Sequence, residues 1–205
     1  GFDMPLEIQV KVQVEGERIV VDFAGTSAQV PKGINSVLNF TEAFTRYALK
    51  CLLAPESPNN DGSFAPIEVR APLGSIVNAR YPAPVGGRHL VGLYIPGIIF
   101  GALASVVPQR VVAESSVLSA MTFSGRDGRD RPYVFTFFCS GGMGGRNGKH
   151  GLDATAFPSN VANVPAEVME QATPIVVTRR ELIVESAGAG RYRGGAGQRI
   201  GLKLD

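Results

Sequence analysis

Residues 6–23 read L-E-I-Q-V-K-V-Q-V-E-G-E-R-I-V-V-D-F, and this stretch decides how the chain starts to fold. Apolar side chains occupy every second position from Leu6 to Val14, with charged or amide side chains between them. A period of two is typical of a strand with one buried face. Residues 15–17 form the turn, and residues 18–23 return as the second strand. The stretch therefore predicts an N-terminal β-hairpin.

The rest of the chain contains more predicted strand than helix. Apolar residues at helical spacing predict a helix over Thr41–Leu53 with Thr41 as its cap, and the apolar stretch Pro96–Val107 predicts a buried helix. Further strands are expected at residues 67–71, 76–78, 117–124, 133–138, 175–184 and 199–204. The fold class predicted is α+β, with strand-rich mixed sheets and one or two buried helices. No linker divides the sequence, so residues 1–205 are expected to form a single domain.

Composition excludes several classes of protein. The chain has 205 residues, 44% of them hydrophobic and 19% charged, with a net charge of +2, which is an ordinary globular balance. No basic run suggests nucleic-acid binding. The longest apolar stretch, residues 90–107, contains Pro96 and is of marginal length for a membrane span. Cys51 and Cys139 fit neither a zinc-finger nor a disulfide spacing, so buried, reduced thiols and a cytoplasmic location are expected.

A glycine-rich segment carries the strongest indication of a functional site. The segment, residues 139–154, opens a stretch that runs to residue 170 and reads C-S-G-G-M-G-G-R-N-G-K-H-G-L-D-A-T-A-F-P-S-N-V-A-N-V-P-A-E-V-M-E, without helical or strand periodicity. Long irregular segments in compact domains are often functional, and Arg146, His150 and Asp153 follow the glycines closely. We predict that these three are catalytic residues. His150 and Asp153 alone make an incomplete metal site, so the metal is unknown.

A second glycine-rich segment occupies residues 188–197. Neither segment has the spacing of a dinucleotide-binding or phosphate-binding loop. Successive backbone N–H groups could bind an anion, and plain turn geometry is the alternative.

Four more polar residues are predicted to contact a substrate. Side-chain amides both donate and accept hydrogen bonds, which suits recognition of a cyclic amide. For the histidine in this group, His89, a purely structural role is the alternative. The candidates are Asn35, His89, Asn160 and Asn163.

Six short motifs give the chain a family resemblance. The first three are V-V-D-F-A-G-T at residues 20–26, G-I-N-S at 33–36 and P-N-N-D-G-S-F-A-P-I at 58–67. P-L-G-S-I-V-N at 72–78, G-G-M-G-G-R at 141–146 and G-A-G-R-Y-R-G-G at 188–195 follow. In this order they resemble the hydantoinase B/oxoprolinase family, which includes N-methylhydantoinase B subunits, 5-oxoprolinases and the acetone carboxylase alpha subunit. Residues 159–163, S-N-V-A-N, depart from the oxoprolinase pattern and favour a hydantoinase-like subunit.

The resemblance implies an ATP-dependent hydrolase that opens hydantoin or lactam rings. This chain resembles the later part of a B-type subunit, and its start at Gly1 is typical of an internal segment. The implied partner is an A-type subunit that binds ATP, in a homo- or hetero-oligomer with a small-molecule substrate. No cofactor is expected in this chain alone, because the divalent metal of the family belongs to the N-terminal part. The isolated chain is expected to be inactive.

Two other interpretations stay open. The chain could be a non-catalytic piece whose glycine-rich segments dock a partner subunit. It could also belong to an acetone-carboxylase-like alpha subunit, which differs in substrate rather than in architecture.

Overall fold

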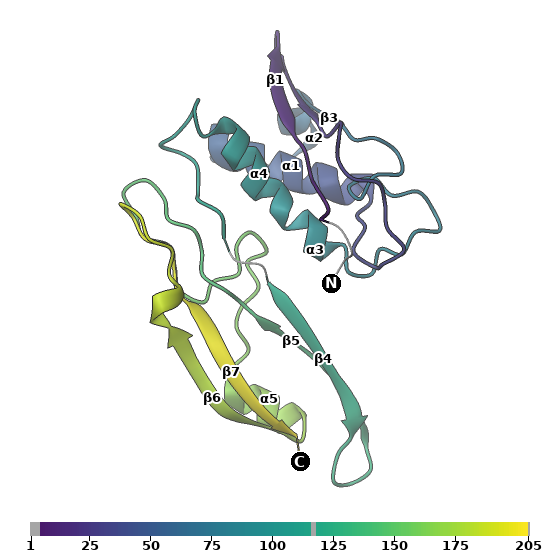
Figure 1. Ribbon diagram of the computed structural model, residues 1–205, viewed down its shortest axis with the longest axis vertical. Coiled ribbons are helices and arrows are strands. Elements are labelled where there is room, and N and C mark those ends of the chain that lie inside the picture. The colour runs from purple at the N-terminus through teal and green to yellow at the C-terminus, as the bar shows by residue number, and fades with distance from the viewer. Residues whose placement is uncertain (1–4, 116–117, 205) are drawn as a thin grey trace. The chain divides into compact units, whose positions relative to one another are not determined.

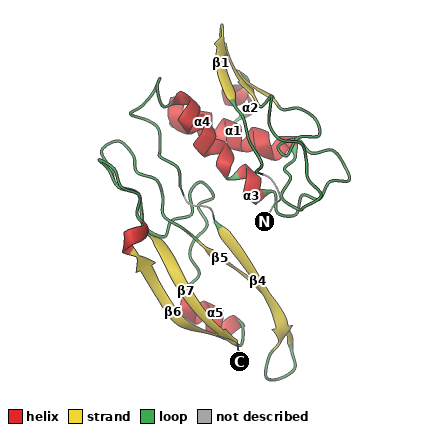
Figure 2. Cartoon of the chain, in the orientation of Figure 1, coloured by secondary structure: helices red, strands yellow, loops and turns green. Residues whose placement is uncertain are grey.

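The computed structural model describes residues 5–115 and 118–204, which fall into two compact units divided between Val111 and Val112 (Figure 1). Helices and strands occur in both units, which confirms the α+β class (Figure 2). The expectation that residues 1–205 form one domain stays a prediction. No helix in the described part of the chain is long and apolar enough to cross a membrane.

The first unit contains a three-stranded sheet in the order β1-β2-β3. β1 (Lys11–Glu15) and β2 (Arg18–Asp22) form the predicted hairpin, and β3 (Ile67–Arg70) pairs with β2 in parallel. Strand β1 is shorter than expected. Before this strand, the backbone N–H groups of Glu7 and Gln9 donate to the hydroxyls of Ser27 and Thr26 instead of to a neighbouring strand.

Helices α1 (Leu38–Leu53), α2 (Asp61–Phe64), α3 (His89–Gly92) and α4 (Tyr94–Leu103) complete this unit, and α1 packs against α4. The prediction that Thr41 caps α1 is wrong, because the helix starts three residues earlier. Thr41 is buried, and its hydroxyl donates to the Val77 carbonyl over 2.6 Å. Pro96 lies in the first turn of α4. Backbone N–H groups in a first turn have no acceptor within the helix, so a proline there costs no helical hydrogen bond.

Two further expectations for the first unit are corrected. Residues 76–78 form a turn closed by an isolated bridge between Ser75 and Asn78, not a strand. Cys51 is exposed on α1 rather than buried, although its thiol is free as expected. Burial and the neighbouring Cys51 together raise the pKa of Tyr47 to about 12, with burial as the larger cause.

The described residues of the second unit form two antiparallel strand pairs and one α-helix. β4 (Ser119–Arg126) pairs with β5 (Pro132–Cys139), and β6 (Ile175–Ile183) pairs with β7 (Gly197–Leu204). β4 confirms the strand predicted over 117–124, whose first residue lies outside the described residues. A single turn of 3-10 helix, η1 (Val184–Ser186), follows β6. Helix α5 (Ala166–Ala172) was not predicted from the sequence.

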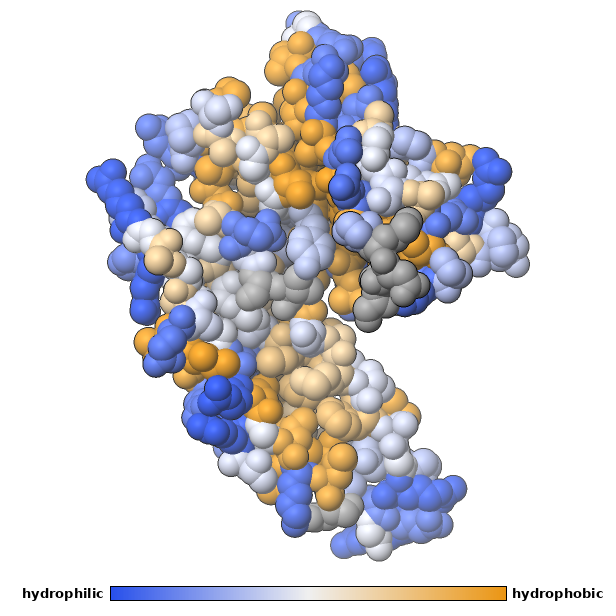
Figure 3. All heavy atoms as spheres, in the orientation of Figure 1, coloured by the Kyte–Doolittle hydropathy of each residue, from blue (hydrophilic) through white to orange (hydrophobic). Residues whose placement is uncertain are grey.

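The core of the second unit is small. Phe137, Met169 and Ile175 are each about 1% exposed, and half-buried side chains from all four strands pack around them. Figure 3 shows hydrophobic residues on the visible surface between β4 and β7. Cys139, at the end of β5, is half-buried and free, and burial raises the pKa of its thiol.

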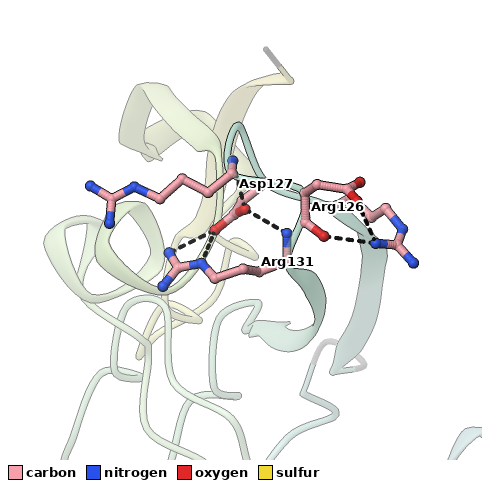
Figure 4. Close-up of polar contacts among 5 residues, drawn as sticks. Arg126, Asp127 and Arg131 are labelled. Carbon is pink, nitrogen blue, oxygen red and sulfur yellow. Dashed lines mark hydrogen bonds and ion pairs between the residues drawn. The ribbon is translucent and has the colours of Figure 1, made fainter.

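Asp127 organises the loop between β4 and β5 (Figure 4). One of its carboxylate oxygens accepts the backbone N–H groups of Arg129 and Arg131, each over 2.9 Å, and the other accepts the Arg131 side chain. These bonds, led by the one from the Arg131 side chain, lower the pKa of Asp127 to about 2. The loop lies two residues later than the turn predicted at 125–128, because β4 continues through Gly125 and Arg126.

Candidate functional site

The two glycine-rich segments of the second unit pack backbone against backbone. The Met143 N–H donates to the Leu152 carbonyl over 3.0 Å, and the Gly195 N–H donates to the Met143 carbonyl over 2.8 Å. The Ala154 N–H donates to the Ala196 carbonyl over 2.8 Å. The first of these bonds lies within the first glycine-rich segment, and the other two hold that segment against the second one.

Glycine is required where these segments pack together, because no side chain fits between the two backbones. A Cβ placed on Gly142 would lie 1.8 Å from the Gly195 carbonyl oxygen, and one on Gly144 would lie 1.8 Å from the Ala113 carbonyl oxygen. Gly151 and Gly195 meet backbone at 1.9 and 2.0 Å in the same way. The glycines serve close approach, which the sequence alone left undecided against simple turns.

A hollow of about 220 Å³ lies among these segments, and we call it the glycine hollow. Glu114 and Tyr192 are its two titratable lining residues. The rest of its wall consists of Ala113, residues 142–145, Ser186, Gly188, Ala189, Gly194 and Gly195. Burial of its carboxyl raises the pKa of Glu114, although the residue as a whole is exposed, and a hydrogen bond with the Ser115 backbone opposes the shift.

Arg146 lies beside the hollow's wall but is not part of its lining. A tight turn through Asn147 and Gly148 joins it to Lys149, with Gly148 at a φ of 77° and two backbone bonds of 2.9 and 3.0 Å. The Arg146 side chain is half-buried, and its Nε is buried without a partner among the described residues. A buried unpaired N–H is costly, which makes this group a candidate to meet an acceptor from elsewhere.

His150 connects the first glycine-rich segment to the second. Its Nδ1 accepts the Arg193 backbone N–H over 2.9 Å, and its ring lies edge-on to the Tyr192 ring with 6.1 Å between centroids. The His150 side chain is exposed. One ring nitrogen is therefore used structurally, and the other is available for chemistry.

Asp153 has a similar arrangement. Its Oδ1 accepts the N–H of the buried residue Ala196 over 2.6 Å, while the residue itself is exposed. His150 and Asp153 thus both bind the backbone of the second glycine-rich segment, at points three residues apart in each segment.

The two later asparagines differ in their environment. Asn163 is half-buried, donates to the Ala154 carbonyl over 2.7 Å and accepts from the Gln198 side chain over 2.9 Å. Asn160 is exposed and has a φ of 54°, a left-handed conformation that asparagine tolerates better than most residues. The backbone conformation accounts for an asparagine at position 160 without reference to a ligand.

Asn35 and His89 belong to the first unit. The Asn35 side chain is fully buried, donates to the carbonyls of Val30, Lys32 and Pro84, and accepts the Val30 N–H over 2.8 Å. His89 is half-buried and begins helix α3. Their predicted contact with a substrate stays a prediction, and the hydrogen bonds of Asn35 give that side chain a structural role of its own.

No group of three or more His, Cys, Asp and Glu side chains in the described ranges could hold a metal ion. The described side chains therefore form no site for the metal that the family resemblance implies. Glu114 and Tyr192 were missed by sequence reasoning as site residues. Tyr192 stands inside the second glycine-rich motif, so a signal existed, whereas Glu114 had none.

Comparison with known proteins places these residues in a wider context. The family model described as hydantoinase B/oxoprolinase matches residues 2–204. A protein of Pseudomonas sp. strain NS671, named as the B subunit of a D-/L-hydantoinase, is 36% identical over 200 residues. That alignment covers 94% of this chain and 34% of the relative, so the chain spans about a third of the relative's length.

Two solved structures share the fold. The ATP-dependent caprolactamase from Pseudomonas jessenii superimposes with a TM-score of 0.82 at 26% identity, over 96% of this chain and 35% of that one. A nucleotide-free acetone carboxylase superimposes with a TM-score of 0.83 at 19% identity, over 95% of this chain and 27% of that one. The second likeness concerns the fold alone.

Proposed function

The chain belongs to the hydantoinase B/oxoprolinase family, and on that premise we propose that it is part of the B-type subunit of an ATP-dependent cyclic-amide hydrolase. The substrate class is a hydantoin or a lactam. The match over residues 2–204 carries this proposal. Two relatives support the reaction class, because one is named as a hydantoinase subunit and the other as an ATP-dependent caprolactamase.

The proposed partner is an A-type subunit that binds ATP and activates the amide. Neither glycine-rich segment has a phosphate-loop spacing, which agrees with nucleotide binding on the partner. We place the assembled enzyme in the cytoplasm.

Arg146 is proposed to stabilise negative charge on the activated amide oxygen or its phosphate. Its guanidinium is half-buried, with Nε lacking a partner among the described residues. A fixed cationic donor in a partly dry site is effective at a developing oxyanion. The role needs an acceptor within reach of Nε, which a bound substrate would provide.

His150 and Asp153 are proposed to assist proton transfer at the ring nitrogen or to orient water. Each uses one acceptor atom to bind the second glycine-rich segment, and each is exposed. The described residues make no further hydrogen bond to either side chain, so His150 Nε2 and Asp153 Oδ2 have capacity for a substrate or water. Each side chain is held in place by its hydrogen bond to the second glycine-rich segment, which supports a role as general acid or base. Asn160, on the following loop, completes the proposed wall.

The test is turnover of the full-length subunit assembled with its A-type partner. We expect ATP-dependent release of the ring-opened product from hydantoin or a lactam. Arg146→Ala should lower turnover by about 10²–10³-fold, the loss typical of removing one oxyanion donor. Arg129→Ala, in the exposed loop between β4 and β5, is the matched control and should leave turnover unchanged. Unchanged turnover in Arg146→Ala would remove this residue from the site.

An interaction piece without catalytic residues is the alternative from a different class. The close backbone packing of the glycine-rich segments favours it, because a rigid scaffold also suits docking. Under this alternative, Arg146→Ala and His150→Ala would abolish co-elution with the A-type subunit in size-exclusion chromatography. Under the enzymatic proposal both variants co-elute normally and lose turnover.

An acetone-carboxylase-like subunit stays the alternative with a second substrate class, and the likeness to acetone carboxylase, which concerns the fold alone, does not decide the substrate. A carboxylase would need carbon dioxide or bicarbonate, and a cyclic-amide hydrolase would not. Turnover of the assembled enzyme with and without bicarbonate decides between them.

A further inference from the structure

The residues that line the glycine hollow include one acidic and one aromatic residue, Glu114 and Tyr192. Glu114 has a hydrogen bond with the Ser115 backbone but forms no ion pair with any described residue. A carboxylate accepts hydrogen bonds and donates none. A ligand that satisfies Glu114 must therefore present a donor.

Tyr192 is fixed beside the hollow by its neighbours. The His150 ring contacts it edge-on, and the Arg191 guanidinium lies 5.6 Å from its centroid. The Tyr192 carbonyl oxygen also packs where a Cβ of Gly145 would stand, 2.4 Å away. A ring that is already held in place loses little side-chain entropy when a ligand packs against it.

Size and shape restrict the ligand further. The volume of about 220 Å³ is below the 300–1,000 Å³ that is usual for drug-sized ligands, so the occupant must be compact. Glycines form much of the wall, and at Gly142, Gly144 and Gly195 neighbouring backbone occupies the position of a Cβ, so the wall there consists of main-chain atoms.

We propose that the glycine hollow binds the cyclic amide itself, with the Glu114 carboxylate accepting a ring N–H and the Tyr192 ring packing against the amide. This inference rests on the proposed function, because it places that function's substrate. It makes Glu114 a specificity-determining residue that distinguishes rings with a free N–H from N-alkylated rings.

His150 then has a second role, as a positioning residue for Tyr192. Its Nδ1 bond to Arg193 and its ring contact with Tyr192 set the aromatic wall of the hollow. The desolvation that raises the pKa of Glu114 also strengthens a hydrogen bond to its charged form.

The test is equilibrium binding of two probes to the full-length subunit that contains this chain, measured by ligand-observed NMR. The probes are hydantoin, with two ring N–H groups, and 1,3-dimethylhydantoin, with none. We expect hydantoin to bind about tenfold more tightly, as the loss of a hydrogen bond to a charged acceptor predicts. Glu114→Gln should weaken hydantoin binding about five- to tenfold and leave dimethylhydantoin binding unchanged. Tyr192→Ala should weaken binding of both probes.

Matched controls separate binding from folding. Gly128→Ala lies in the loop between β4 and β5, where a Cβ meets open space, and should bind both probes like the wild type. Far-ultraviolet circular dichroism and the unfolding midpoint of each variant confirm that it is folded. Equal affinity of the wild type for the two probes, undetectable binding of both, or unaltered hydantoin binding in a folded Glu114→Gln variant would each overturn the proposal.

The proposed function is tested separately by turnover of the assembled complex. ATP-dependent ring opening with an unchanged KM in Glu114→Gln refutes the hollow as the substrate site and leaves the function intact. Hydantoin binding that depends on Glu114, without any ring opening by the complex, supports the hollow and refutes the hydrolase function.

Discussion

The Nδ1 atom of His150 accepts a hydrogen bond from the backbone N–H of Arg193, with 2.9 Å between the two nitrogens. A histidine that accepts at Nδ1 carries its proton at Nε2 in the neutral form, and a doubly protonated ring cannot make this bond. The contact therefore fixes both the tautomer of His150 and the path of the second glycine-rich segment, 43 residues away in sequence.

A pair of variants at position 150 separates these two roles. Asparagine can replace the Nδ1 acceptor with its side-chain oxygen but offers no imidazole for proton transfer. We expect His150→Ala to lower the free energy of unfolding by about 0.5–1.5 kcal/mol, the usual value of one hydrogen bond. His150→Asn should recover that stability, yet both variants should lose turnover in the assembled enzyme. Recovery of turnover in His150→Asn would assign the residue a positioning role alone.

Glycine substitutions test the backbone packing at the site. Gly142→Ala places a Cβ 1.8 Å from the Gly195 carbonyl oxygen, and backbone cannot move aside cheaply. We expect a loss of about 1–3 kcal/mol or more in the free energy of unfolding, measured by urea denaturation. Gly128→Ala, with open space around the new Cβ, should stay within about 0.5 kcal/mol of wild type. Equal effects of the two substitutions would contradict the packing described here.

Substitution of Asn35 tests whether its role is structural. Its amide makes four hydrogen bonds to backbone groups and is fully buried. Asn35→Ala should lower the free energy of unfolding by about 3 kcal/mol or more, because several buried backbone groups lose their partners. The control Asn59→Ala, at an exposed asparagine of the same unit, should change it by less than about 0.5 kcal/mol. A stable Asn35→Ala variant with a raised KM would instead support the predicted substrate contact.

The carboxyl of Asp127 provides a pH-dependent signal. Its folded-state pKa is about 2, below the ordinary value of 3.8, so its contribution to stability is complete above pH 3.8. That contribution is lost as the pH falls from 3.8 toward 2. We expect the side-chain carboxyl resonance of Asp127 to titrate near pH 2 in carbon-detected NMR. The difference in urea midpoint between wild type and Asp127→Asn should shrink over the same range, and a midpoint difference that is constant between pH 5 and pH 2 would refute this account.

The sequence predicted two elements correctly from their periods, although β1 begins only at Lys11. Alternation between Leu6 and Val14 gave the hairpin, and helical spacing after Thr41 gave α1. It failed where tertiary contacts compete with local signals. Threonine is a residue type that often caps helices, yet the Thr41 hydroxyl donates a hydrogen bond to the Val77 carbonyl instead. Residues 76–78 have strand-forming side chains, yet they have no neighbouring strand to pair with and form a turn.

The sequence by itself determined the fold class and the family. Hydrophobic periodicity and the order of the motifs can be read without knowing which residues meet in the folded chain. It also identified the two glycine-rich segments as unusual. Only the tertiary structure decided why they are rich in glycine and what Glu114, Tyr192, His150 and Asp153 face. Those answers depend on backbone groups that lie tens of residues apart in the chain and come within hydrogen-bonding distance only after folding.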